Sequence, residues 1–196
     1  PFPSEEAKVH RNRIIETGDT GRKVFLMKDA QGNISDEPAE DFLLAEFPHP
    51  GGFVDAPVQL FEPLPLQRPA FGLYVAGMDD YKHDQSDGES VGTIYIYKRQ
   101  WFDPFSMTIV ASYASRPNPR SKFDRQAHYL LQAYNAVLFH ENEDNNFKTY
   151  LDGKHETEVY LAQGFDFAAE LNLNNNGNRK YGWQATTKNI EFGYSL

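Results

Sequence analysis

The sequence of 196 residues contains no cysteine, and this absence excludes disulfide bonds and thiolate metal sites. No apolar run reaches the length of a membrane span, and the first residues do not have the pattern of a signal peptide. The formal net charge of −9 excludes a uniformly basic surface for nucleic acid. Any contact with nucleic acid therefore needs a local basic patch or a bound divalent cation.

Long helices are excluded from the first part of the chain, because prolines recur there at positions 38, 48, 50, 57, 63, 65 and 69. Residues 23–28 are nevertheless typical of a strand, with a turn at 31–33, and residues 57–61 favour a short extended piece. We expect residues 1–70 to form an irregular lead-in or linker with short strands. Because the chain begins with Pro1 rather than Met, we also expect it to be a fragment.

Three strands are predicted from residue 71 onward. Residues 71–78 are apolar on both faces, which favours a central strand that is covered on both sides. Residues 92–98 alternate β-branched and aromatic side chains, and residues 107–113 form a third candidate strand. The connection at 101–106 is short, so the second and third strands are expected to be antiparallel neighbours.

A helix and a fourth strand follow. Asn118 and Pro119 predict an N-cap and a first-turn proline. Apolar residues then recur at helical spacing at Phe123, Ala127, Leu130, Leu131 and Tyr134. Residues 136–140 predict a short buried strand, and a second short helix is expected at 145–151. A helical crossover into the fourth strand favours a parallel neighbour in the same sheet, so the sequence predicts an α/β fold.

Two carboxylates directly follow predicted buried strands, Asp79 after the first and Glu141 after the fourth. If these strands are parallel neighbours, both acids leave the sheet at the same edge, where their charges repel unless they share a cation. Mg²⁺ binds through carboxylate oxygens and water, and two such ions promote phosphoryl displacement. The alternative is that each acid only solubilises a turn. The histidines at 83, 128, 140 and 155 lack the spacing of a zinc site.

The segments "YVAGMDDYKHD", "VGTIYIYKRQ" and "AVLFHENED" carry a resemblance to a known family. Their order of strand, acid, strand, strand, helix, strand, acid resembles that of ribonuclease H-like nucleases. More narrowly, it is similar to the nuclease domain of tailed-bacteriophage terminase large subunits, which cut concatemeric viral DNA during genome packaging. The resemblance implies that 71–196 is a ribonuclease H-like mixed sheet of three antiparallel strands, a crossover helix and a parallel fourth strand, truncated at its C-terminus.

The same resemblance implies a metal-dependent DNA endonuclease. Asp79 and Glu141 match the family's catalytic acids and metal ligands, and Asp80 is a further candidate ligand for Mg²⁺ or Mn²⁺ in a two-metal site. The family's third acid lies on a late helix, which we expect beyond Leu196. Candidates within the chain are Asp166, Glu170 and Glu191. The isolated fragment is therefore expected to be weak or inactive.

Further implications concern partners and location. No G-x-x-x-x-G-K-[ST] stretch is present, so ATP would be used only by a motor domain outside this chain. Double-stranded DNA, the portal and the small terminase subunit are the implied partners, in the host cytoplasm and without a membrane. Candidate DNA contacts are Arg116, Arg120, Lys122, Arg125 and Lys188, although such a cluster is also typical of an exposed face.

Two alternatives to this reading stay open. A Holliday-junction resolvase of the same fold class would use similar acids, but such enzymes are usually small basic dimers and this chain is acidic. A ribonuclease H-like module that serves only as a docking piece would need no metal. Binding of a divalent metal at Asp79 and Glu141 separates the nucleases from the docking module.

Overall fold

The computed structural model describes residues 21–46, 49–81, 90–99, 108–140 and 146–161, together with the single positions 12, 16 and 18. The strands are β1 (Arg22–Lys28), β2 (Ile34–Pro38), β3 (Val58–Leu60), β4 (Tyr74–Asp79), β5 (Gly92–Lys98), β6 (Thr108–Ser115) and β7 (Val137–His140). The helices are α2 (Ser121–Tyr134), α3 (Asn146–Asp152) and α4 (Thr157–Tyr160). The predicted order of three strands, a helix, a strand and a short helix is confirmed.

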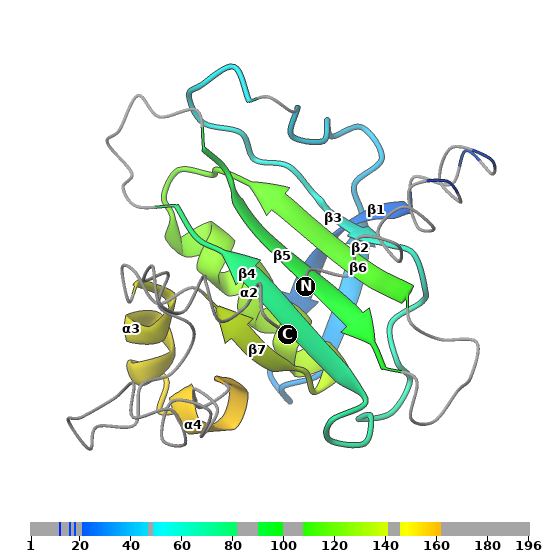
Figure 1. Ribbon diagram of the computed structural model, residues 1–196, viewed down its shortest axis with the longest axis vertical. Helices are drawn as coiled ribbons and strands as arrows, with labels where there is room; N and C mark the ends of the chain where they lie inside the picture. The colour runs from blue at the N-terminus through cyan, green and yellow to red at the C-terminus, as the bar shows by residue number, and fades with distance from the viewer. Residues whose placement is uncertain are drawn as a thin grey trace, which may run out of the picture.

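The seven strands form one mixed sheet with the spatial order β2-β1-β3-β6-β5-β4-β7 (Figure 1). Neighbouring strands are antiparallel except for β4 and β7, which pair in parallel from Val75 with Val137 to Met78 with His140. The crossover that joins β6 to β7 contains α2. The predicted mixed sheet with a parallel pair after a helical crossover is therefore confirmed.

The segment expected as a lead-in, 1–70, contributes three strands to this sheet. β3 pairs with β6, and β1 pairs with both β3 and β2. The side chain of Gln126 in α2 ties β1 to the helix, because its amide accepts a hydrogen bond from the Leu26 N–H at 2.8 Å and donates one to the Leu26 carbonyl at 2.9 Å. The sheet is thus continuous across residue 70, while the division of the chain into domains there stays a prediction.

One face of the sheet is covered by α2, as Figure 1 shows. The helix buries the five apolar side chains that the sequence analysis assigned to its inner face, Phe123, Ala127, Leu130, Leu131 and Tyr134. They pack against a layer of strand residues that includes Val24, Leu26, Tyr74, Ala76, Ile94, Ile96 and Leu138. Within the described part of the chain, no helix is both long enough and apolar enough to cross a membrane.

The predicted start of this helix is wrong by two residues. The N-cap is Arg120 rather than Asn118, and the α-helix begins at Ser121. A tight turn comes first, because the Lys122 N–H donates to the carbonyl of Pro119 at 3.0 Å. The shift places Arg120 where its side chain reaches back to β4.

A left-handed residue at the other end of α2 turns the chain into β7. Asn135 has φ 47° and ψ 41°, a conformation that asparagine adopts more readily than most residues. Its side-chain amide accepts a hydrogen bond from Arg68 at 2.9 Å and donates one to the carbonyl of Pro69 at 3.0 Å. These contacts fix the point at which the crossover returns to the sheet.

The two faces of β4 differ in burial, and here the sequence analysis was wrong. It predicted a strand covered on both sides over 71–78, but β4 begins only at Tyr74, and Phe71 is 72% exposed. Tyr74, Ala76 and Met78 are buried on the α2 side, whereas Gly77 on the opposite face is exposed. Side chains alternate between faces along a strand, so a helix on one face covers only every second residue.

Candidate functional site

The candidate site lies at the carboxyl end of the parallel pair. Met78 of β4 pairs with His140, the last residue of β7, and Asp79 follows Met78 as the last residue of β4. Asp79 is exposed and lies opposite Thr93 of β5. The predicted adjacency of the two parallel strands is confirmed. Glu141 lies outside the described residues, and so do five other residues that were singled out in the sequence: His83, Asp166, Glu170, Lys188 and Glu191.

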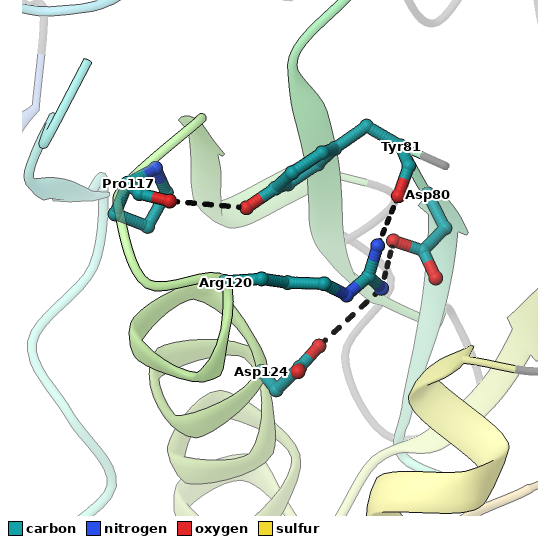
Figure 2. Close-up of polar contacts among 5 residues, drawn as sticks. All are labelled: Asp80, Tyr81, Pro117, Arg120 and Asp124. Atoms are coloured by element: carbon teal, nitrogen blue, oxygen red, sulfur yellow. Dashed lines mark hydrogen bonds and ion pairs between the residues drawn. The ribbon is translucent and has the colours of Figure 1, made fainter. Parts of the chain in front are cut away.

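Asp80 lies in a different environment from Asp79, although the two are adjacent in the chain. Its carboxylate is paired with the Arg120 guanidinium at the start of α2, and its side chain is only 14% exposed (Figure 2). The backbone N–H groups of Tyr81 and Phe147 also donate hydrogen bonds to this carboxylate. Burial raises the pKa of Asp80, and the charge and hydrogen bond of Arg120 act in the opposite direction.

The guanidinium of Arg120 makes several contacts at once. One terminal nitrogen donates to the carbonyl oxygen of Tyr81, and the other bonds Asp80 and lies 3.5 Å from Asp124 Oδ1 (Figure 2). The guanidinium also lies 4.9 Å from the centroid of the Tyr81 ring. The hydroxyl of that ring donates to the carbonyl of Pro117 at 3.4 Å. This cluster joins the end of β4 to the chain that enters α2.

The other basic candidates for DNA contact lie in three different settings. Arg116 has no exposed surface, and its guanidinium donates to the Ser90 carbonyl at 2.5 Å. Lys122 forms an ion pair with Asp55 at 2.7 Å and keeps 41% of its side chain exposed. Arg125 is exposed on α2. Of the four basic residues at 116–125, Arg125 is therefore exposed and Lys122 is partly exposed beside Asp55, whereas Arg116 and Arg120 contact the protein and are largely covered.

An open strip of the sheet, which the sequence analysis missed, adjoins Asp79. Gly77 pairs with Tyr95 of β5 on one side and with Phe139 of β7 on the other, so all three lie in one row on the face opposite α2. Tyr95 is 45% exposed and Phe139 is 39% exposed. A Cβ added at Gly77 would meet no atom within 4 Å, so the space above the glycine is open. The period-two alternation of 92–98 was the signal that could have placed Tyr95 on this face.

Two buried histidines lie near the candidate site, His140 at the end of β7 and His128 in α2. Both ring nitrogens of His140 are buried with no hydrogen-bond partner among the described residues, and burial lowers the pKa of His140. His128 in α2 lies 2.5 Å from Glu156 through Nε2 and 3.5 Å from the Tyr150 hydroxyl through Nδ1. Burial lowers the pKa of His128, and Glu156 opposes the shift.

The described residues offer few donors for a hard divalent cation. Among the described residues there is no group of three or more His, Asp or Glu side chains that could hold a metal ion. Asp79 offers an exposed carboxylate, whereas the carboxylate of Asp80 is held by Arg120. One exposed carboxylate fits an ion such as Mg²⁺ that keeps most of its coordinated water.

Comparison with models of protein families, with curated proteins and with solved structures gives no match.

Proposed function

We propose that this chain is a divalent-metal-dependent DNA endonuclease with a ribonuclease H-like sheet, of the kind that cuts concatemeric viral DNA during genome packaging. The observation that carries the proposal is the parallel pairing of β4 with β7, in register up to Met78 and His140. The next residue in each segment of the chain is an acid, Asp79 or Glu141. Neighbouring parallel strands that are each followed by a carboxylate are a suitable arrangement for sharing a cation.

A divalent ion held by these carboxylates would supply an activated water molecule and would neutralise charge on the phosphate and the leaving oxygen. Asp79 contributes an exposed anionic oxygen donor, and Glu141 is proposed as the second. Lys122 and Arg125, in the first two turns of α2, are the proposed phosphate contacts, because their side chains are exposed. Arg116 is left out of this set because it is fully buried.

Nicking of supercoiled plasmid tests the proposal. We expect weak nicking that is stronger with Mn²⁺ than with Mg²⁺, because two carboxylates leave much of the coordination to water. Asp79→Asn and Glu141→Gln should each reduce the rate on the order of a hundredfold, since each removes charge that fixes the metal. Asp36→Asn is the matched control, because Asp36 lies on β2 and pairs with Arg22, at the opposite end of the strand order.

The same assay addresses the two alternatives. A resolvase would cleave a four-way junction in preference to the plasmid. A docking module would neither nick DNA nor bind Mn²⁺ in calorimetry. The ion pair between Asp80 and Arg120 favours this alternative, because the pair removes one carboxylate from the candidate metal ligands. Cleavage without metal, or full activity in Asp79→Asn, would refute the proposed nuclease.

A further inference from the structure

The carboxylate of Asp80 is bound by groups from three parts of the chain. Arg120 reaches it from the start of α2, the Tyr81 N–H from the residue after it, and the Phe147 N–H from α3. Arg120 also donates a hydrogen bond to the carbonyl oxygen of Tyr81, so the backbone is restrained at Tyr81 as well as at Asp80 (Figure 2). Asp80 and Tyr81, the two residues that follow β4, are thus held by groups at the start of α2 and in α3.

The position of the Asp80 side chain also determines the direction of the Asp79 side chain. Successive side chains point to opposite faces, so a carboxylate at 80 that is held on the α2 side requires the side chain at 79 to point to the open face. That is the face of Gly77, Tyr95 and Phe139. On this basis we propose that Arg120 is a positioning residue, which holds Asp80 and Tyr81 so that the Asp79 carboxylate is presented to a divalent cation. The inference rests on the metal-dependent function proposed above.

The described residues on either side of 141–145 also contact the end of β4 and the residue that follows it. His140, which precedes that segment, pairs with Met78 of β4, and Phe147, just beyond it, donates its N–H to Asp80. Both flanks of the segment that contains Glu141 are therefore tied to the last residues of β4 and the residue after them.

The sign of the effect on metal affinity separates positioning from simple electrostatics. Arg120 is a cation, so its removal alone would lower repulsion and release the Asp80 carboxylate, and a divalent cation would bind more tightly. Positioning predicts the opposite result. Changes to residues that orient metal ligands typically weaken metal affinity by about 10- to 100-fold. We therefore expect Arg120→Ala to bind Mn²⁺ at least about tenfold more weakly than the wild type.

Mn²⁺ titration followed by electron paramagnetic resonance measures this affinity without reference to cleavage. Arg120→Lys is the second variant, since it keeps the positive charge beside Asp80. Its single nitrogen cannot serve both the Tyr81 carbonyl and Asp80 as the two guanidinium nitrogens do. It should also bind Mn²⁺ more weakly than the wild type. Asp80→Asn should lose less affinity than Arg120→Ala, because the amide still accepts a hydrogen bond, whereas Asp79→Asn should lose binding altogether.

Arg22→Ala is the matched control, because it removes an arginine–aspartate ion pair between β1 and β2, remote from β4 in the strand order. It should bind Mn²⁺ as the wild type does, with circular dichroism confirming that every variant is folded at the assay temperature. Equal or tighter binding by both Arg120 variants would overturn the positioning role and leave the proposed function standing. Absence of Mn²⁺ binding in the wild type would overturn both.

Discussion

The close packing beneath β5 allows a quantitative test of the structure at Gly92. A Cβ added there would lie 2.7 Å from two ring carbons of Phe123 and 2.8 Å from Cδ1 of Tyr81. These rings are at most 1% exposed, and Phe123 stacks on Tyr113 with ring centroids 5.2 Å apart. The rings are enclosed and cannot move aside without disturbing their neighbours. Gly92→Ala is therefore an overpacking substitution.

The expected loss is the difference of two effects. Overpacking of a buried core costs about 1–3 kcal/mol. Replacing a glycine in a strand by alanine recovers about 0.5–1 kcal/mol of backbone entropy. The free energy of unfolding should thus fall by about 1.25 kcal/mol, the difference between the midpoints of the two ranges, which lowers Tm by about 2.5–5 °C for a chain of this size. Thermal unfolding followed by circular dichroism measures the change.

Gly77→Ala is the matched control, because it makes the same substitution on the adjacent strand, where the added Cβ meets no atom within 4 Å. Only the entropic gain remains, so Tm should stay the same or rise by about 1–4 °C. If Gly92→Ala left Tm unchanged, the packing of Phe123 and Tyr81 against β5 would be wrong. If Gly77→Ala lowered Tm as much, the open space on the other face would be wrong.

Three further predictions concern stability and DNA contact. Because the pKa of His128 is lowered in the folded protein, the unfolded chain takes up a proton below about pH 6.5 that the folded chain does not. The free energy of unfolding should therefore decrease as the pH falls from 6.5 toward the folded-state pKa, by up to about 1.4 kcal/mol per pH unit. His128→Gln should reduce that slope in urea unfolding at pH 7 and pH 5.5, and an unchanged slope would refute the assignment. Leu131→Ala should cost about 2–5 kcal/mol in the same assay, because Leu131 is fully buried in the α2 face, and a loss below 1 kcal/mol would contradict this packing. Arg125→Ala should lower the salt dependence of DNA binding by about one phosphate contact in fluorescence anisotropy, whereas an unaltered slope would place DNA elsewhere.

Local periodicity explains which elements could be predicted from the sequence. The inner face of α2 and the strand at 92–98 follow from spacings of 3.6 and 2 residues, which depend only on near neighbours in the chain. The parallel pairing of β4 with β7 followed from the helix between β6 and β7. These elements lie where the sequence placed them.

The features that escaped prediction depend on contacts between residues distant in the chain. The bond between Gln126 and Leu26 spans 100 residues, and no local pattern indicates that β1 would be joined to α2 in this way. The start of α2 was misplaced because a proline turn precedes the helix. Arg120 was assigned to DNA for its charge alone, since its partner Asp80 lies 40 residues earlier.

Asp79 and Asp80, at the end of β4 and just after it, lie in different environments because Arg120 contacts only one of them. Adjacent residues of a strand point to opposite faces, so Asp79 and Asp80 cannot both face one site while the strand geometry persists. Arg120 pairs with Asp80 on the helix side, where a buried carboxylate without a cation would be costly. Asp79 is left exposed on the face that no described helix covers, beside the end of β7. The sequence shows that two acids are present, and the arginine 40 residues away from Asp80 pairs with that acid and leaves the carboxylate of Asp79 exposed.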